Sequence, residues 1–91
     1  MEYDIVNNTA ASRYELEEQG HTAYADYQLD GGTLRLDYVY APPELRGKGT
    51  AGRLMEGILA EAREQGLRIL PICGYAASWL KRHASVADII E

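Results

Sequence analysis

The chain has 91 residues, of which 46% are hydrophobic and 25% are charged, and a chain of this length supports one compact domain over residues 1–91. Its 9 Lys and Arg residues stand against 14 Asp and Glu residues, so the formal net charge is -5 and no overall positive field attracts nucleic acid or an anionic membrane. We therefore expect a monomer or a small homo-oligomer that favours a basic partner, with no nucleic acid and no membrane among its partners.

The first twelve residues predict a short strand or an arm followed by a turn, because Asn7 and Asn8 are followed by small residues. Residues 1–4 have neither the basic nor the apolar region of a signal peptide. No apolar run approaches the roughly 18 residues that span a bilayer. These features favour a cytoplasmic location.

Two alternating segments predict a pair of antiparallel strands. Polar and apolar residues alternate over residues 13–19, Gly20 breaks the run, and a second alternation follows. The residues that share one face of this second segment are His21, Ala23, Ala25, Tyr27 and Leu29. A further hairpin turn is predicted at residues 30–32, because Gly31 and Gly32 tolerate the positive φ angles that such turns need.

Residues 33–40 predict a third strand of this series. A period of two places one group on one face, namely Leu34, Leu36, Tyr38 and Tyr40, and a second group on the other, namely Arg35, Asp37 and Val39. Pro42 and Pro43 end the strand, because proline cannot donate a backbone hydrogen bond.

The clearest helix follows the glycine-rich segment. Apolar residues recur there at helical spacing, at Ala51, Leu54, Met55, Ile58, Leu59 and Ala62. Gly66 is expected as the C-terminal cap, and residues 67–72 then form a short apolar run typical of a buried strand parallel to residues 33–40. Residues 76–83 predict a second helix, and residues 86–90 predict a short helical or irregular tail that packs on the sheet.

The glycine-rich segment at residues 45–52 has the features of an anion site. The first turn of a helix leaves backbone N–H groups without partners, and the helix dipole adds a partial positive charge at the same end. Glycine at positions 47, 49 and 52 removes side chains that would keep a diphosphate away. Full charges are available from Arg46, Lys48 or Arg53.

Three other interpretations of this segment exist. The glycine spacing also satisfies the dinucleotide fingerprint, but that motif needs a doubly wound sheet and an acidic residue about 20 positions further on, where Ile72 stands. A Walker loop does not fit, because Lys48 is followed by Gly49 and not by Ser or Thr. A purely structural alternative also exists, in which the glycines only make a tight turn and Gly52 permits close helix packing.

Residues 46–51, Arg-Gly-Lys-Gly-Thr-Ala, resemble the signature of the GNAT acetyltransferase superfamily, which is Arg or Gln, two residues, Gly, one residue, and Gly or Ala. Residues 39–45 look like the strand and elbow that precede it, and the order of elements over residues 31–83 is similar. The whole length is similar to the short YjdJ-type branch, in which a cysteine just after the last core strand is typical, as Cys73 is here.

The resemblance implies a compact α+β GNAT-like fold, with a mixed, mostly antiparallel sheet, a crossover helix after the third or fourth strand and a second C-terminal helix. It implies acetyl-coenzyme A (acetyl-CoA) as the cofactor, with the backbone at Val39 and Tyr40 bonding the pantetheine arm. The residues implied to cradle the pyrophosphate are Arg46, Gly47, Lys48, Gly49, Thr50, Ala51 and Gly52.

The same resemblance leaves the catalytic residues open. Family members often carry Asn, Ala and Tyr at positions in register with Cys73, Ala76 and Leu80, so the usual tyrosine that protonates the leaving thiolate is missing. Tyr75 could replace it if its hydroxyl reaches the cleft. Cys73 either lines the pantetheine slot or accepts the acyl group covalently.

Histidine and acidic residues give weaker predictions. His21 and Glu44 are both candidates for a general base. Cys73 is the only cysteine, and His21 and His83 lie far from it in sequence, so no metal site is expected. The aromatic residues expected to fill the core or to line an acceptor cleft are Trp79, Tyr24, Tyr27 and Tyr38.

The sequence therefore favours an N-acetyltransferase whose acceptor is a small amine or a basic peptide. A non-catalytic acyl-CoA-binding or sensing module is the alternative, because the usual tyrosine acid is missing. A nucleotide-phosphate binding domain that only mimics the cradle is a third possibility.

Overall fold

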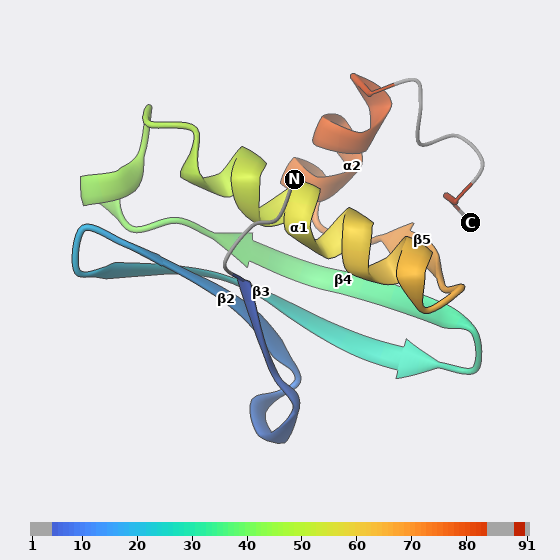
Figure 1. Ribbon diagram of the computed structural model, residues 1–91. Coiled ribbons are helices and arrows are strands. Elements are labelled where there is room, and N and C mark those ends of the chain that lie inside the picture. Colours follow the sequence, from blue (N-terminus) through green and yellow to red (C-terminus); the bar gives the residue numbers. More distant parts are fainter. Residues whose placement is uncertain (1–4, 84–88, 91) are drawn as a thin grey trace.

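One mixed sheet organises the part of the chain that this computed structural model describes, which is residues 5–83 and 89–90. Its strands lie side by side in the order β1 (Ile5–Asn8), β2 (Arg13–Glu18), β3 (His21–Asp30), β4 (Thr33–Tyr40) and β5 (Arg68–Pro71). Neighbouring strands are antiparallel, except that β5 runs parallel to β4. The helices α1 (Thr50–Glu64) and α2 (Gly74–Lys81) lie on one face of this sheet (Figure 1).

This architecture confirms the predicted α+β fold, with the crossover helix α1 after the fourth strand and α2 near the C-terminus. Parallel pairing of β4 and β5 requires such a crossover, and α1 provides it. Two short 3₁₀ turns, at Thr9–Ala11 and Pro43–Leu45, connect β1 to β2 and lead from β4 toward α1. No helix in the described part of the chain is long and apolar enough to cross a membrane.

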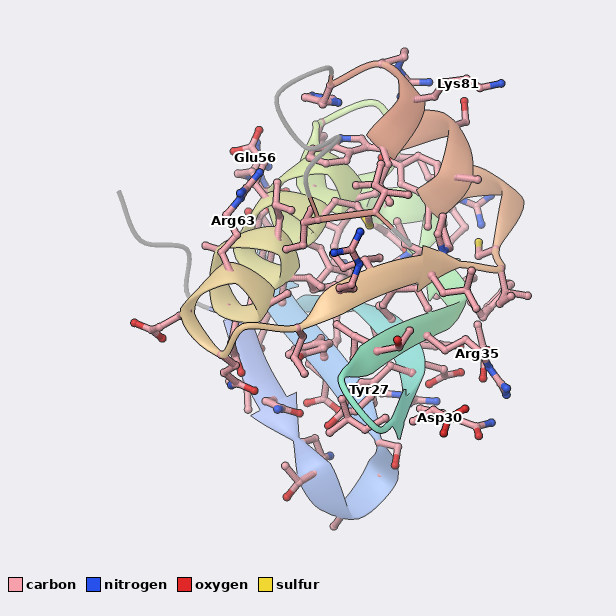
Figure 2. The ribbon with its side chains drawn as sticks, turned by 90° about the vertical axis from the view of Figure 1, so that its right-hand side faces the viewer. Tyr27, Asp30, Arg35, Glu56, Arg63 and Lys81 are labelled. Carbon is pink, nitrogen blue, oxygen red and sulfur yellow. The ribbon has the colours of Figure 1, made fainter. Side chains whose placement is uncertain are left out.

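The helix α1 buries the apolar stripe that the sequence predicts. Leu54, Met55 and Ile58 are at most 1% exposed against the sheet. Charged side chains such as Glu56 and Arg63 point to the outer side of the helix (Figure 2). The sheet and the two helices therefore share one hydrophobic core.

The C-terminal end of α1 is capped as predicted. Gly66 adopts a φ of 70°, a left-handed conformation that glycine accepts without steric cost. Its N–H donates to the carbonyl of Arg63 at 3.2 Å, and the N–H of Leu67 donates to the carbonyl of Ala62 at 2.8 Å. This pair of bonds satisfies carbonyl groups that the helix would otherwise leave open.

A β-bulge in β4 overturns the strict alternation predicted for residues 33–40. Tyr27 pairs with Leu36, but the preceding residue Asp26 pairs with Tyr38, so Asp37 is an extra residue on β4. Such an insertion reverses the facing of every side chain that follows it. Val39 therefore turns into the core at 9% exposure, while Tyr38 and Tyr40 turn to the opposite face.

The burial of the C-terminal end of β3 also differs from the prediction. Ala23, Ala25 and Tyr27 are buried as expected, but Leu29 is 57% exposed. The reason is that β2 pairs with β3 only as far as Asp26, so residues 28–30 have a neighbouring strand on one side alone.

The first and the last described segments of the chain both contact the sheet. The first strand predicted within residues 1–12 is present as β1, and residues 1–4 lie outside the described part of the chain. Within the predicted tail at residues 86–90, only Ile89 and Ile90 are described. Ile89 is 5% exposed and its carbonyl accepts a hydrogen bond from the N–H of Ile69 at 2.8 Å, so these two residues pack on the sheet as expected.

Candidate functional site

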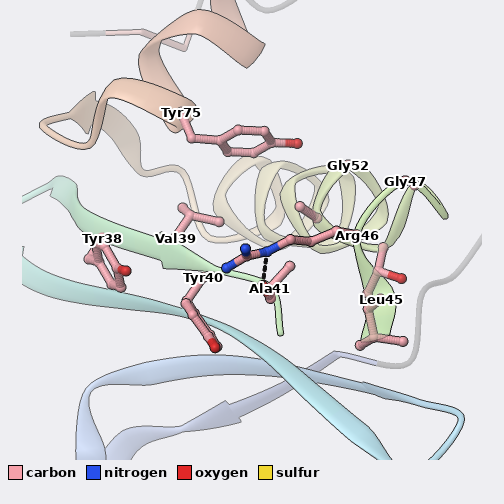
Figure 3. Close-up of a pocket in the computed structure, with 12 residues that line it drawn as sticks. Tyr38, Val39, Tyr40, Ala41, Leu45, Arg46, Gly47, Gly52 and Tyr75 are labelled. Carbon is pink, nitrogen blue, oxygen red and sulfur yellow. Dashed lines mark hydrogen bonds between the residues drawn. The ribbon is translucent and has the colours of Figure 1, made fainter. Parts of the chain in front are cut away.

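A pocket of about 370 Å³ lies where the end of β4, the loop before α1 and the start of α2 meet (Figure 3). The residues that line it are Tyr38, Val39, Tyr40, Ala41, Leu45, Arg46, Gly47, Gly49, Thr50, Ala51, Gly52 and Tyr75. The resemblance points to eleven residues for cofactor binding or for protonation of the leaving thiolate, and nine of them are brought together in this pocket. The other two, Lys48 and Cys73, are not among the lining residues.

The loop before α1 presents open backbone donors to this pocket. Gly47 and Gly49 adopt φ angles of 79° and 80°, which turn the chain into the helix. The first helical hydrogen bond runs from the N–H of Arg53 to the carbonyl of Gly49 at 3.0 Å. Among the described residues, no hydrogen-bond acceptor is paired with the N–H groups of Gly47, Gly49, Thr50, Ala51 and Gly52.

These amides fit a phosphate-bearing ligand. A Cβ placed on Gly47 would meet no atom within 4 Å, so the space beside this amide is open to a ligand. Unpaired N–H groups at a helix start, together with the helix dipole, favour an anion there. Gly52 has a second role, because a Cβ at this position would lie 3.5 Å from Nε1 of Trp79 and so α1 approaches α2 closely here.

Arg46 supplies the positive charge of the pocket. Its Nε donates to the carbonyl of Ala41 at 2.9 Å, and its guanidinium carbon lies 5.7 Å from the centre of the Tyr40 ring. These contacts direct the guanidinium between Tyr40 and Tyr75 (Figure 3). No carboxylate among the described residues forms an ion pair with Arg46, so its charge is available to an anionic ligand.

Arg53, another candidate cation, is already engaged by a carboxylate. Its Nη2 and Nε donate to the two carboxylate oxygens of Glu18 at 2.7 and 2.8 Å, and Thr50 donates its hydroxyl to the same carboxylate at 2.6 Å. The hydrogen bonds from Arg53, and then that from Thr50, lower the pKa of Glu18 to about 2. Nη2 of Arg53 also donates to the carbonyl of Lys48 at 3.0 Å, so this network holds the loop.

Sequence patterns did not identify Glu18 as part of the site, although a signal was present. Tyr14 and Leu16 face the helices from β2, and alternation places Glu18 on the same face. An acidic residue at the end of an apolar strand face needs a cationic partner. The cationic loop at residues 46–53 was the available partner.

Tyr75, in the first turn of α2, closes the pocket opposite β4. Its hydroxyl points toward the start of α1 in Figure 3. Partial burial raises the pKa of this hydroxyl above its ordinary value, because the low-polarity surroundings disfavour the phenolate. The group therefore keeps its proton at neutral pH and can donate it.

The remaining candidates lie away from the pocket. Cys73 precedes α2, is half-buried, and donates its N–H to the carbonyl of Leu36 at 3.1 Å. His21 and Glu44 approach each other at 3.8 Å with well-exposed side chains. His83 stacks on Trp79 with ring centres 3.8 Å apart. No group of three metal-ligating side chains occurs in residues 5–83 and 89–90.

Comparison with known proteins agrees with this arrangement. The chain resembles the NMR solution structure of a GCN5-like candidate N-acetyltransferase from Staphylococcus aureus, with a TM-score of 0.76 and 22% sequence identity over 97% of this chain and 87% of that one. At this identity the likeness establishes the fold. A search of curated proteins found no significant sequence match.

A family model described as GCN5-related N-acetyl-transferase matches residues 13–89. The matched region includes β2 to β5, both helices, and every residue that lines the pocket. The chain therefore belongs to the GCN5-related N-acetyltransferase family.

Proposed function

We propose that this chain transfers an acetyl group from acetyl-CoA to an amine of a small molecule or a basic peptide. The observation that carries the proposal is the group of unpaired amides at Gly47 and at residues 49–52, which lies in one pocket with Arg46, a cation that forms no ion pair among the described residues. In this role the amides and Arg46 bind the coenzyme A pyrophosphate.

The end of β4 offers a place for the pantetheine arm. The last residue of β4 that pairs with β5 is Leu36, so residues 37–40 have no partner in β5. At this edge of β4, backbone groups of Val39 and Tyr40 can form hydrogen bonds with the amides of an extended ligand instead of with a neighbouring strand. Both residues line the pocket, which supports this assignment.

The bound cofactor would supply an acetyl group activated as a thioester. An acceptor amine in its neutral form would bond its nitrogen to the acetyl carbon while the carbon–sulfur bond breaks and the sulfur takes the electron pair. The nitrogen loses a proton and the sulfur gains one, which gives an amide and a free thiol. In this proposal a backbone N–H near Val39 would polarise the carbonyl, and the Tyr75 hydroxyl would protonate the sulfur, since both residues line the pocket.

Two finer assignments go with this proposal. Cys73 directly after β5 favours the YjdJ-type branch, in which a cysteine at this place is typical. An unpaired cysteine is typical of a reducing compartment, which favours the cytoplasm.

A non-catalytic acyl-CoA-binding module is the second candidate. The observation in its favour is Leu80, which is 2% exposed in the core at the position where family members often carry the tyrosine acid. Such a module would bind acetyl-CoA with the same amides but would not release a thiol in the presence of amines.

Calorimetric titration with acetyl-CoA tests the proposal. We expect Arg46→Ala to weaken binding about tenfold or more, because a charge-assisted contact to phosphate is lost. Lys48→Ala is the matched control, since it removes a neighbouring charge that does not line the pocket. Absence of wild-type binding would refute both candidates.

Turnover separates the two candidates. Free thiol release is measured with a panel of amines under saturating acetyl-CoA. Release with at least one amine supports the transferase, and tight binding with no release across the panel supports the module.

A further inference from the structure

The face of the sheet opposite the helices carries a cluster of three tyrosines, Tyr24, Tyr38 and Tyr40, which we name the tyrosine face. The ring centre of Tyr24 lies 6.3 Å from that of Tyr38 and 5.3 Å from that of Tyr40. The Tyr38 and Tyr40 rings are stacked, with their centres 6.4 Å apart. No described helix covers this side of the sheet (Figure 1). Tyr38 is 48% exposed, so a large ring is left open to solvent.

The tyrosine face is continuous with the proposed acetyl-transfer pocket. Tyr38 and Tyr40 line that pocket, although their side chains point away from the helices and Val39 points toward them (Figure 3). The bulge at Asp37 produces this arrangement, because it turns two consecutive members of the cluster onto the open face. A ligand on these rings would therefore lie next to the end of β4.

The rings already interact with cations within the chain. The guanidinium carbon of Arg13 lies 3.8 Å from the centre of the Tyr24 ring, and that of Arg46 lies 5.7 Å from Tyr40. Both distances are within the range of cation–π attraction. The exposed Tyr38 ring has no such cation among the described residues and is open to one from a ligand.

The charges on this face also favour a cationic ligand. Its carboxylates come from β2, β3 and β4, namely Glu15, Glu17, Asp26 and Asp37. Only Asp26 and Asp37 are neutralised by arginines, through Arg13 and Arg35 at 2.8 Å each. The face therefore keeps a negative excess beside its aromatic rings.

We propose that the tyrosine face selects acceptors that carry a second positive charge in addition to the amine that is acetylated. This inference rests on the proposed transferase function. The reacting amine must be neutral when it attacks, so it cannot itself supply the electrostatic attraction. A second, permanent cation on the acceptor binds the exposed ring of Tyr38, and the neutral amine reaches from there into the pocket.

The test compares two amines of the same chain length, of which only one carries a trimethylammonium group. (5-Aminopentyl)trimethylammonium has one amine and one fixed cation, and pentylamine has the amine alone. With the wild-type chain loaded with acetyl-CoA, we expect kcat/KM to be about tenfold higher for the dicationic probe. Tyr38→Leu should remove this preference and Tyr38→Phe should keep it, because phenylalanine retains the ring face. Equal kcat/KM for both probes with the wild type overturns the proposal.

A binding measurement makes the test independent of turnover. Ring signals of Tyr24, Tyr38 and Tyr40 are followed by NMR while each probe is added without acetyl-CoA. We expect saturable shifts with the trimethylammonium probe, and at least severalfold weaker ones with pentylamine. Unchanged ring signals overturn the proposal, whereas shifts without any thiol release would refute the transferase function and leave the cation site in place.

A third measurement distinguishes a small-molecule acceptor from a peptide. The capped dipeptide acetyl-Lys-Arg-amide carries a lysine amine and a fixed guanidinium, and its matched control is acetyl-Lys-Ala-amide. Preference for the arginine peptide, lost in Tyr38→Leu, assigns the second cation to a peptide side chain. Preference for the small probe alone assigns it to a small diamine, and no preference in either pair overturns the proposal. Calorimetry with acetyl-CoA shows in parallel whether Tyr38→Leu changes cofactor binding.

Discussion

Glu18, at the end of β2, holds Arg53 in the first turn of α1 through two hydrogen bonds of 2.7 and 2.8 Å between carboxylate and guanidinium. The two residues come from segments that are 35 positions apart, and the carbonyl of Lys48 shares the same guanidinium. The conformation of the loop thus depends on a strand that is distant in sequence.

Glu18→Gln should lower the free energy of unfolding by about 1 kcal/mol at pH 7, because a bidentate, partly shielded ion pair becomes a neutral contact. Urea denaturation measures this difference. The neighbouring change Glu17→Gln is the control, since Glu17 is exposed on the other face and should stay within about 0.5 kcal/mol of wild type. Equal losses in both variants would mean that the ion pair does not stabilise the fold.

The pH dependence of this stabilisation follows from the pKa of Glu18. In the folded chain this pKa is lowered to about 2 from an ordinary value of 4.5, so the contribution is fully present above the higher value. It is lost progressively as the pH falls from about 4.5 toward 2. Stability curves of the wild type and Glu18→Gln should therefore converge over this range, and parallel curves would contradict the lowered pKa.

Gly57→Ala should destabilise the wild type but stabilise an Ile5→Ala background. In the wild type the new Cβ would lie 2.8 Å from Cγ2 of Ile5. The neighbouring atoms must shift to avoid this clash, which lowers the free energy of unfolding by about 1–3 kcal/mol. Without the isoleucine side chain, only the gain in helix propensity of about 1 kcal/mol remains. A double-mutant cycle of unfolding free energies measures the coupling, and additive effects would refute the contact.

Gly49→Ala should weaken acetyl-CoA binding about tenfold or more. Gly49 has a φ of 80° at the start of α1, and a Cβ there would also lie 3.1 Å from Nη1 of Arg53. A matched variant is Gly31→Ala, which has a φ of 65° in a hairpin turn with no atom near its Cβ. Both variants incur a backbone penalty of about 1 kcal/mol, but only the first should change the calorimetric affinity. A similar loss of affinity in both would show that the loop has no special role.

Tyr75→Phe should lower kcat about tenfold or more and leave the affinity for acetyl-CoA unchanged, because only the proton donor is removed. Thiol-release kinetics and calorimetry measure the two quantities.

Cys73→Ala, in contrast, should retain turnover, and the mass of the wild-type chain during turnover should show no acetyl adduct, because the thiol is not part of the pocket lining. An acetylated wild-type chain during turnover would instead support the covalent route.

The sequence predicts those elements whose conformation depends on local residue patterns. The apolar repeat from Ala51 to Ala62 produces α1, and Gly66 ends it, because both signals are local. The unpaired amides near Gly47 and Gly49 are predictable for the same reason, since any helix start leaves such groups open.

Features that depend on partners distant in sequence were not predictable. The bulge at Asp37 is visible only in the pairing of β4 with β3, so alternation assigned Tyr38 and Val39 to the wrong faces. The engagement of Arg53 by Glu18 depends on how β2 and α1 meet in space. Local patterns therefore predicted the open amides of the loop but not the residues that hold the loop in shape or the faces of the sheet on which Tyr38 and Val39 lie.

The open donors of the loop belong to the main chain, and this has a consequence for the inheritance of the site. Binding through main-chain donors requires the left-handed turns at Gly47 and Gly49, and it needs no particular side chain at the donors themselves. Two proteins can keep the same fold while sharing only about a fifth of their residues, as the 22% identity of the staphylococcal structure illustrates. Divergent relatives are then better identified by the backbone torsion angles of this turn than by its amino-acid sequence.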